Sequence, residues 1–459
     1  MMSRSEVLEL AKRADAGDIE RVFDETTALL NTEQDNPWVK FLYAKMSFKA
    51  QHYGVAKVMM ESALATMPNN GMFHMNYALI LDNLDELDAA IAAYRKAEAD
   101  SSLDKSELYA NYASTFLKMG ALEKGADYVD RALKLNPGNK TARGTRAFVN
   151  FQLNTDLRLA WDDYTNLIGG QFRKLNDYGV PMWNGEPNAR LIVQGEQGIG
   201  DEMMYASCLP DLIERGQCAD IALDVDSRTV RLLRGSFPGI ACYGSRAIPM
   251  DRKPWVHEFA PTHATLIGEL PRLYRPDPEA FTGKSYLSPP DELVAMYRQL
   301  TRHATPAHTI YGIAWSGGSR NTHEKEREIP LAAFKSLIEA KPHAKFFSLQ
   351  YRDGTEAEIR ESGLPIKHFH WVTGKGANYE HTASFIKACD VIVSTDTTAI
   401  HAAGACGVKT HCLLSTPSMW LHPPWATERS VWYESVKLHR KPKGRSWESF
   451  MESKKEVLN

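Results

Sequence analysis

Residues Leu191 to Pro210 read LIVQGEQGIGDEMMYASCLP, and this stretch decides the fold of the C-terminal part of the chain. An apolar, strand-like run ends at three closely spaced glycines and a carboxylate, and a helix-like segment follows. Gly195, Gly198 and Gly200 can take backbone angles closed to other residues and let a ligand approach the main chain. They predict a ligand-binding turn at a helix N-terminus, where N–H groups are unpaired. Asp201 is expected to face that ligand.

The spacing of this turn identifies no ligand by itself. It matches neither the dinucleotide fingerprint nor the phosphate loop GxxxxGK[ST], since no Lys or Ser/Thr follows the last glycine. A second turn lies about two hundred residues downstream, in Asp390 to Gly407, DVIVSTDTTAIHAAGACG. There a buried-strand pattern runs into Asp396, Thr397 and Thr398, and a small-residue helix carrying His401 follows. Two such units predict two facing nucleotide-binding lobes with a cleft between them.

The first third of the chain repeats itself with a shift of 34 or 35 residues. The recurring positions are Tyr43-Ala44, Ala56 and Ala63, then Tyr77-Ala78, Ala90 and Ala97, then Tyr112-Ala113, Gly125 and Ala132. This is the tetratricopeptide period, with small residues where the two helices of a unit pack closely. Residues 147–164 resemble a degenerate fourth unit, and residues 3–30 a capping pair. Such repeats stack into a solenoid whose concave face commonly binds peptide or protein.

The predicted fold class is therefore an all-α solenoid followed by an α/β region. Residues 1–168 form the helical domain, and residues 169–190, rich in turn formers, form a linker. Residues 191–300 form a first α/β lobe, and residues 301–459 form a second lobe with a C-terminal tail. The expected strands are 190–194, 221–225 and 239–243 in the first lobe, and 309–315, 345–349, 391–395 and 410–414 in the second.

Composition is typical of a large soluble protein. The 459 residues are 43% hydrophobic and 24% charged, enough for two or three cores without disulfides or metals. The sequence has no signal-peptide core and no run long enough to span a bilayer, so a cytoplasmic location is expected. Its six cysteines lack CxxC spacing and are expected to be reduced. A net charge of −3 gives no general attraction to nucleic acid. The basic run Lys437 to Arg445 is expected to be a solvated tail, and the alternative is a role at a polyanion or membrane surface.

At these motifs the chain resembles the heptosyltransferase-like superfamily, glycosyltransferase family 9-like. It is more closely similar to bacterial and phage proteins that fuse tetratricopeptide repeats to such a region. The matching motifs are WxGEP (183–187), EQGxGD (196–201), GIAWSG (312–317), REIPLAAF (327–334), FFSLQ (346–350) and DTTAIHAAGA (396–405). They cover about residues 180–440. The resemblance implies the GT-B plan of two Rossmann-like lobes, with a nucleotide-sugar donor on the second.

A sugar transferase must stabilise a departing nucleotide diphosphate. Backbone N–H groups and hydroxyls at Thr397 and Thr398, with the helix dipole that begins there, would form an anion site without a metal. The resemblance implies that this loop contacts the diphosphate and that Lys325 or Arg327 adds positive charge. The predicted donor-binding residues are Ser316, Lys325, Arg327, Gln350, Asp396, Thr397, Thr398 and His401. Alternatively, Asp396 and Thr397 only cap the helix, which is worth about 1 kcal/mol, and His401 is a packing residue.

The transferase must also remove a proton from the acceptor hydroxyl. The resemblance implies that Asp201, in the Gly-Asp turn, is the catalytic base, and Glu196 is the second candidate. Gly198 and Gly200 belong to this acceptor-side turn. Either carboxylate could act by direct inversion as the diphosphate leaves from the opposite face. Asp201 could instead only cap its helix.

No metal or other cofactor is expected besides the nucleotide sugar. Asp224-Val-Asp226 spells the DxD of metal-dependent sugar transferases, but it lies in the first lobe rather than on the donor side. The favoured function is a metal-independent inverting glycosyltransferase of hexosyl or heptosyl type, whose repeats recruit a protein or glycan acceptor or form a homo-oligomer. A hydroxylated nucleobase acceptor stays open. The alternatives are a GT-B nucleotide-sugar epimerase or hydrolase, and a repeat scaffold with a decayed catalytic region.

Overall fold

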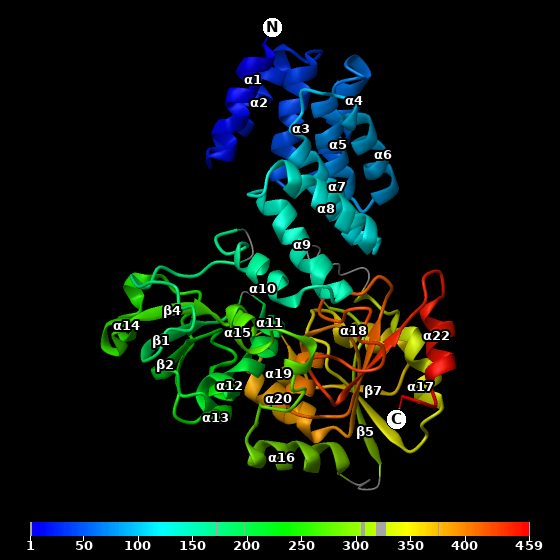
Figure 1. The fold of residues 1–459 in the computed structure, drawn as a ribbon. Coiled ribbons are helices and arrows are strands. Elements are labelled where there is room, and N and C mark those ends of the chain that lie inside the picture. Colours follow the sequence, from blue (N-terminus) through cyan, green and yellow to red (C-terminus); the bar gives the residue numbers. More distant parts are fainter. Residues whose placement is uncertain are drawn as a thin grey trace. The chain divides into compact units, whose positions relative to one another are not determined.

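A computed structural model of the chain describes residues 2–170, 173–196, 198–303, 308–317, 327–374 and 376–458. The chain forms two compact units, Met1–Val149 and Asn150–Asn459 (Figure 1). The described part of the first unit is helical, and the second alternates strands and helices. Among the described residues, none of the helices has the length and apolar character that crossing a membrane requires.

The first unit is built from consecutive helix pairs. The pairs are α1 (Arg4–Asp15) with α2 (Ile19–Thr32), α3 (Pro37–Lys49) with α4 (Tyr53–Thr66), α5 (Gly71–Asn83) with α6 (Leu87–Glu98), and α7 (Lys105–Lys118) with α8 (Leu122–Leu135). Helix α9 (Lys140–Leu153) begins in this unit. Helices α3, α5 and α7 start at residues 37, 71 and 105, a repeat of 34 residues. The predicted tetratricopeptide-type solenoid is confirmed.

Each repeat begins at a capping side chain placed with the same period. Asn36 accepts a hydrogen bond from the Trp38 N–H (3.0 Å), and Asn70 accepts one from the Phe73 N–H (3.0 Å). Asp104 starts the third repeat in the same way. Such caps satisfy backbone donors that have no partner inside the helix. The repeat boundary is therefore set by local sequence.

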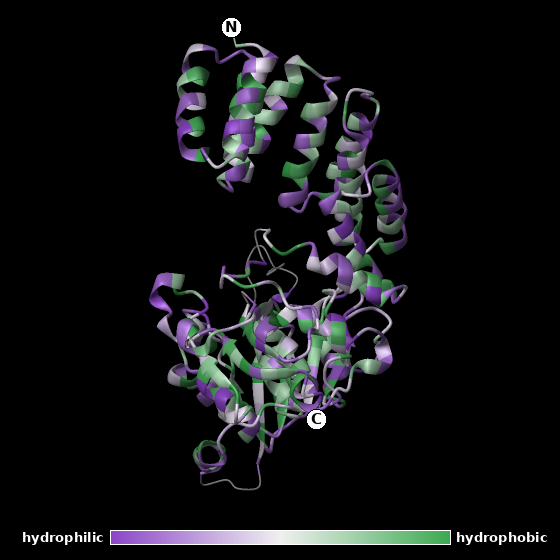
Figure 2. Cartoon of the chain, turned by 60° about the vertical axis from the view of Figure 1, so that its left-hand side comes forward, coloured by the Kyte–Doolittle hydropathy of each residue, from purple (hydrophilic) through white to green (hydrophobic). Residues whose placement is uncertain are grey.

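The small residues of the repeats lie where helices pack. All nine small positions of the repeat pattern are buried. A Cβ atom at Gly125 would lie 3.5 Å from the Ala113 carbonyl oxygen, so α7 and α8 approach backbone to backbone there. Figure 2 shows hydrophilic and hydrophobic residues side by side along these helices, as expected when one face of each is buried.

The second unit contains two parallel sheets. The first sheet has the order β3-β2-β1-β4, formed by β1 (Ala189–Gln194), β2 (Cys218–Asp224), β3 (Ala241–Tyr243) and β4 (His263–Leu266). The second has the order β10-β9-β8-β5-β6-β7, formed by β5 (Thr309–Ala314), β6 (Ala344–Ser348), β7 (Ile366–His368), β8 (Val391–Thr395), β9 (Thr410–Leu414) and β10 (Val436–Arg440). This confirms an α/β region with parallel sheets.

Helices precede, connect and follow these strands. They are α10 (Leu157–Thr165), α11 (Ile199–Tyr205), α12 (Leu209–Glu214), α13 (Val230–Ser236), α14 (Pro254–Phe259), α15 (Leu270–Tyr274), α16 (Asp291–Arg302), α17 (Lys335–Glu339), α18 (Thr355–Ser362), α19 (His370–Thr373), α20 (Tyr379–Ala388), α21 (Thr398–Ala405) and α22 (Trp447–Lys454). The strand order reverses between β1 and β4 in the first sheet and between β5 and β8 in the second. Open parallel sheets bind ligands outside the carboxyl ends of strands at such points.

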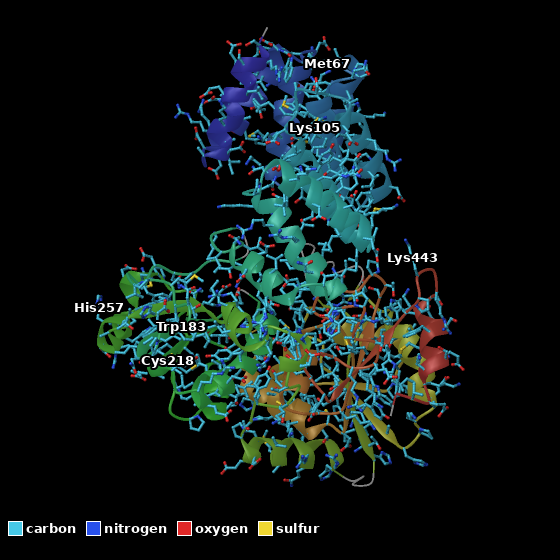
Figure 3. All side chains as sticks on the ribbon, in the orientation of Figure 1. Met67, Lys105, Trp183, Cys218, His257 and Lys443 are labelled. Carbon is cyan, nitrogen blue, oxygen red and sulfur yellow. The ribbon has the colours of Figure 1, made fainter. Side chains whose placement is uncertain are left out.

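Strands β4, β7 and β10 were not predicted from the sequence. The expectation of a solvated tail beginning at Lys437 was wrong for residues 437–440, because they pair with β9 as the edge strand β10. Leu438 is buried, and Arg440 donates hydrogen bonds to Ser418 and to the carbonyl oxygen of Pro423. Lys443 is exposed, on the loop before α22 (Figure 3).

The end of α9 and the whole of α10 belong to the second unit. Trp161 of α10 donates from Nε1 to the Arg275 carbonyl oxygen (2.8 Å). Trp425 donates from Nε1 to the carbonyl oxygen of Phe151 (2.9 Å), whose ring stacks on Trp420. These tryptophans therefore join the α9–α10 segment to the α/β region.

A tight contact in α21 gives a stability test. A Cβ atom at Gly404 would overlap the Tyr433 ring. We expect Gly404→Ala to lower the free energy of unfolding by about 1–3 kcal/mol, because overpacking outweighs the gain in helix propensity. The matched helical control is Gly54→Ala in α4, where a Cβ meets nothing within 4 Å and stability should rise by up to about 1 kcal/mol. Scanning calorimetry measures both, and an unshifted Gly404→Ala melting transition would contradict the expectation.

Candidate functional site

The turns after β1 and β8 meet through the helices that follow them. A Cβ atom at Gly200, in the first turn of α11, would lie 3.1 Å from His401 Cδ2 and 3.6 Å from Thr398 Oγ1 of α21. Glycine at this position therefore lets the two helix starts come into contact. Each turn follows a strand that borders the reversal of strand order in its sheet. The sequence analysis predicted that both turns face one cleft, and in the structure the two turns lie close together.

The expectation that the three glycines take backbone angles closed to other residues was wrong. None of Gly195, Gly198 and Gly200 has a positive φ, and φ of Gly198 is −89°. They are required instead for close contact. A Cβ at Gly195 would overlap the Glu202 carboxylate, and one at Gly198 would lie 2.6 Å from Asp201 Oδ2. Gly195 and Gly198 make room for acidic side chains of α11, and Gly200 makes room for His401 of α21.

Asp201 is a half-buried carboxyl group in the first turn of α11. The N-cap of α11 is Gly198, so Asp201 does not occupy the cap position. Burial, and then the charge of Glu196, raise the pKa of Asp201 to about 7, although Arg327 opposes this shift. Asp396 raises it further. A carboxyl group with a pKa near neutrality can take up or release a proton in contact with a ligand.

Glu196 lies in a buried ion cluster. Arg173 Nη2 contacts Glu196 Oε1 at 2.9 Å and Glu269 Oε1 at 2.7 Å. Arg173 Nη1 also donates to the Tyr164 carbonyl oxygen (2.7 Å), and its guanidinium lies 3.9 Å from the centre of the Tyr164 ring. Burial raises the pKa of Glu196, and Arg173 opposes that shift. Glu196 is thus held by an arginine, which makes Asp201 the freer base.

Asp396 forms a buried pair with His422. His422 Nε2 lies 3.2 Å from Asp396 Oδ1. Burial alone would raise the pKa of Asp396, but His422 and then Arg327 hold it well below its usual range. In the described part of the chain, Asp396 Oδ2, His422 Nδ1 and Arg327 Nε are buried without a hydrogen-bond partner. Such atoms indicate a site for a polar ligand or water.

His401 and Thr397 have structural contacts of their own. His401 Nδ1 lies 3.1 Å from the Tyr433 hydroxyl, and burial lowers the pKa of His401 to about 4, so the ring is neutral at pH 7. Thr397 is the N-cap of α21, and its Oγ1 accepts from the Ala399 N–H (3.3 Å). Thr397 therefore caps α21, whereas Asp396 is held by His422. Contact of Thr397 with a donor stays a prediction.

Ser316 and Gln350 lie together at the ends of β5 and β6. Gln350 Nε2 donates to Ser316 Oγ (2.8 Å) and to the Ser316 carbonyl oxygen (2.7 Å), and its Oε1 accepts from the Trp315 N–H (3.2 Å). The Gln350 amide therefore fixes the β5 turn. A Cβ at Gly317 would lie 2.5 Å from Thr397 Cγ2, which places this turn against α21. Lys325 lies outside the described residues.

Both aspartates of the DxD string form ion pairs with basic side chains of the same unit. Asp224 is fully buried and pairs with Lys253 at 2.6 Å. Asp226 pairs with Arg228 at 2.9 Å and with Arg246 at 3.0 Å. Among the described residues, three or more His, Cys, Asp or Glu side chains nowhere form a group suited to a metal ion. Metal independence stays a prediction.

Sequence reasoning missed four residues of this region: Arg173, Glu269, His422 and Tyr433. Arg173 lies in the expected linker, and Glu269 follows the missed strand β4. His422 and Tyr433 lie between β9 and β10. No spacing links any of them to the two turns, because each reaches the site from a distant segment. A charged residue within an apolar run indicates a buried ion pair, and Glu269 in TLIGELP (265–271) gave such a signal.

Comparison with known proteins identifies the helical unit. The tetratricopeptide repeat family matches residues 73–98 and 106–139, which are α5–α6 and α7–α8. Over 415 residues the chain is 24% identical to Protein FlbA of Caulobacter vibrioides, covering 85% of this chain and 67% of FlbA. Among solved structures, MamA from Desulfovibrio magneticus RS-1 is 17% identical and covers 36% of this chain and 92% of MamA, with a TM-score of 0.30. The pilus biogenesis factor PilW is 17% identical, with coverages of 35% and 76% and a TM-score of 0.33.

The buried ion cluster gives a second stability test. Arg173→Met removes the cation between two buried carboxylates, and we expect a loss of about 3–5 kcal/mol at pH 8. The loss should be smaller at pH 5, where Glu196, whose pKa is raised by burial, can take up a proton. The control is Arg21→Met, whose 76% exposed side chain pairs with Glu25 at 3.5 Å and should change stability by less than about 1 kcal/mol. Urea unfolding measures both variants, and equal losses would contradict the role given to Arg173.

The pKa of Asp201 predicts a pH-dependent stability. Its pKa is about 7 in the fold, against about 3.9 in an unfolded chain. The folded state therefore binds the proton more tightly, and ionisation destabilises the fold increasingly from about pH 4 to about pH 7. Asp201→Asn cannot ionise, so its melting temperature relative to wild type should rise between pH 4 and pH 8.

Asp396→Asn should behave in the opposite way. The depressed pKa of Asp396 means that its charge stabilises the fold above about pH 4, and that this contribution is lost as the pH falls below that value. The melting temperature of Asp396→Asn should therefore lie below that of wild type at pH 8, and the difference should shrink in acid. The same pH trend for both variants would contradict one of the two assignments, and the direction of that trend would show which one.

Proposed function

We propose that the chain is a metal-independent inverting glycosyltransferase of the GT-B plan, with its two sheets as the two lobes. It would transfer a hexosyl or heptosyl group from a nucleotide-diphosphate donor to an acceptor hydroxyl. One observation carries this proposal. Asp201, a half-buried acid whose pKa is about 7, sits on α11 where that helix contacts α21, the helix that follows the Asp396 turn.

The second sheet supplies the donor side in this proposal. The start of α21 carries the N-terminal end of a helix dipole, which favours a diphosphate. The half-buried Thr398 hydroxyl and the unpartnered Nε of Arg327 add hydrogen-bond donors. Ser316, fixed by Gln350 beside this turn, and Lys325 complete the proposed donor-binding set.

The first sheet supplies the base. The acceptor oxygen forms a bond to the anomeric carbon while the bond from that carbon to the diphosphate oxygen breaks. The acceptor proton passes to the Asp201 carboxylate, and Arg327 and the start of α21 stabilise the charge on the diphosphate. Attack from the face opposite the leaving group inverts the anomeric configuration. Glu196 is the second candidate for the base.

The helical unit would recruit the acceptor. It contains tetratricopeptide repeats, which commonly bind protein segments. A protein acceptor, or a glycan carried by a partner protein, therefore fits better than a nucleobase, since the net charge of the chain is −3. A homo-oligomer formed through the repeats fits the same surface. A cytoplasmic location would give access to nucleotide sugars.

A non-catalytic scaffold is the second candidate function. Two observations favour it: the family match lies entirely within the repeats, and Thr397 and Gln350 use their polar atoms within the fold. A scaffold would bind a partner through its repeats but would bind no nucleotide. The unpartnered polar atoms of Asp396, His422 and Arg327 argue for a ligand instead.

Ligand binding separates the two functions. Melting temperature would be measured with ADP, GDP, UDP, CDP and dTDP, each with and without its sugar. A ligand at a hundred times its dissociation constant stabilises the fold by about 2.7 kcal/mol. We expect one diphosphate to do this in wild type and in the exposed-site control Arg21→Met, but not in Arg327→Met. No stabilisation by any nucleotide would favour the scaffold.

Asp201→Asn tests the base once the donor is known. We expect incorporation of labelled sugar into host-cell protein and glycan to fall by about 10²- to 10⁴-fold, while the donor still raises the melting temperature. Asp251→Asn, at an exposed position of the first sheet region, is the matched control and should transfer sugar normally. Full transfer by Asp201→Asn would move the base to Glu196.

A further inference from the structure

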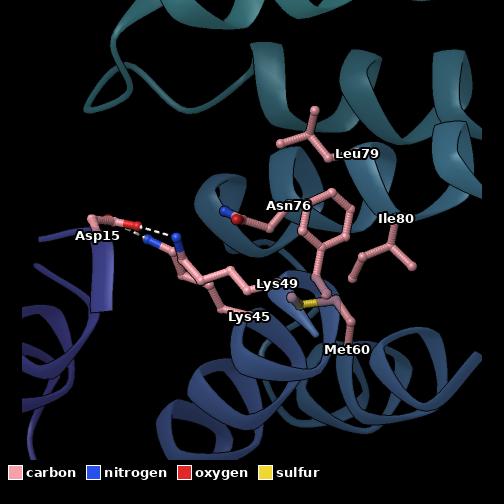
Figure 4. Close-up of a pocket in the computed structure, with 8 residues that line it drawn as sticks. Asp15, Lys45, Lys49, Met60, Asn76, Leu79 and Ile80 are labelled. Atoms are coloured by element: carbon pink, nitrogen blue, oxygen red, sulfur yellow. Dashed lines mark hydrogen bonds and ion pairs between the residues drawn. The ribbon is translucent and has the colours of Figure 1, made fainter. Parts of the chain in front are cut away.

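A cavity of about 240 Å³ lies in the helical unit (Figure 4). Its lining comes from α1, α3, α4 and α5. The lining residues are Asp15, Lys45, Phe48, Lys49, Met60, Asn76, Leu79 and Ile80. The cavity is formed within Met1–Val149, the unit that contains the tetratricopeptide repeats, and none of the proposed catalytic residues belongs to it.

One side of the cavity carries an excess of positive charge. Asp15 Oδ2 contacts Lys45 Nζ at 2.9 Å, and Asp15 Oδ1 contacts Lys49 Nζ at 2.8 Å. One carboxylate therefore neutralises only one of two ammonium groups. Asn76 Nδ2 donates one hydrogen bond to the Met72 carbonyl oxygen, and the two ammonium groups carry the positive charge of the cavity.

The other side of the cavity is apolar. Met60 and Ile80 are buried, and Phe48 and Leu79 are half-buried. An ammonium pair beside an aliphatic surface is complementary to a segment that carries a carboxylate next to an aliphatic side chain. Each kind of contact is weak at an exposed site, but the cavity allows both at once.

The repeats contain an internal comparison. Two repeats after Lys49, Lys118 pairs with Asp82 of α5 at 2.8 Å, and Asp82 also accepts from the Thr115 hydroxyl. The Asp82 side chain is only 12% exposed, so that pair is a closed structural contact. The Asp15 side chain is 50% exposed and shares a second lysine, Lys45. The Asp15–Lys49 pair corresponds to the Asp82–Lys118 pair two repeats later, so the contact between repeats accounts for Lys49. Lys45 has to share the Asp15 carboxylate with Lys49.

We propose that this cavity binds an acidic segment of a partner protein. A Glu or Asp side chain of the partner contacts the Lys45 and Lys49 ammonium groups, and a neighbouring aliphatic side chain packs on Met60, Leu79 and Ile80. Asp15 stays in place and weakens binding, because it competes for the same two ammonium groups. The inference concerns the repeats alone and stands whether or not the α/β unit transfers sugar.

The test uses fluorescence anisotropy with the full-length chain and two labelled peptides of alternating Glu/Leu or Gln/Leu sequence. We expect the Glu/Leu peptide to bind at least about tenfold more tightly than the Gln/Leu peptide, and its affinity to fall as salt rises. Lys45→Met and the Lys45→Met/Lys49→Met double variant should remove this difference. Asp15→Asn should tighten binding several-fold. Lys12→Met, at a 77% exposed position of α1, should leave binding unchanged.

The outcomes are separable from a loss of folding. Far-ultraviolet circular dichroism reports the helix content of each variant, and the single variant Lys45→Met leaves the Asp15–Lys49 pair intact. Equal binding of the two peptides, no binding of the Glu/Leu peptide at millimolar concentration, or unchanged or weaker binding by Asp15→Asn would each overturn the proposal. A purely structural Asp15 predicts a less stable variant with no gain in affinity.

Discussion

One buried cation, Arg173, links the loops that carry the first sheet's part of the site. Arg173 lies between Glu196 and Glu269, which follow β1 and β4, the strands where the order of the first sheet reverses. A buried charge is tolerated only when it is paired and hydrogen-bonded, so the guanidinium fixes both loops and the carbonyl group of Tyr164 at once. The start of α11 follows directly, and the position of Asp201 depends on this cluster.

The two turns carry carboxyl groups with opposite proton affinities. Burial and neighbouring carboxylates hold the pKa of Asp201 near 7, whereas His422 and Arg327 hold the pKa of Asp396 low. Environments that separate the pKa values of nearby acids are a common way to assign one to proton transfer and another to a fixed charge. The neutral His401 between the turns packs against α11 and adds no charge.

Local signals predicted most of the fold. The 34-residue period, the caps and the small residues defined the repeats, and long apolar runs defined seven strands. The missed strands β4 and β7 have only four and three residues, and β10 alternates basic with apolar positions at a sheet edge. Motifs also located both turns of the site. Arg173, Glu269 and His422 could not be found, because tertiary contacts bring them from distant loops, and a sequence cannot show whether Thr397 is a cap or a ligand.

The contacts of helix α10 limit which part of the chain evolution can exchange as a repeat module. Its Trp161 and Tyr164 are integral to the α/β unit, through the Arg275 carbonyl oxygen and the Arg173 cluster. Repeats that precede α9 contact mainly their neighbours, so whole 34-residue modules can be gained or lost there at little cost. A recombination that exchanged α10 would remove the support of the β1 and β4 loops. The part of the chain that can be exchanged therefore ends inside α9, near Val149. This point lies before residues 169–190, which composition indicates as the linker.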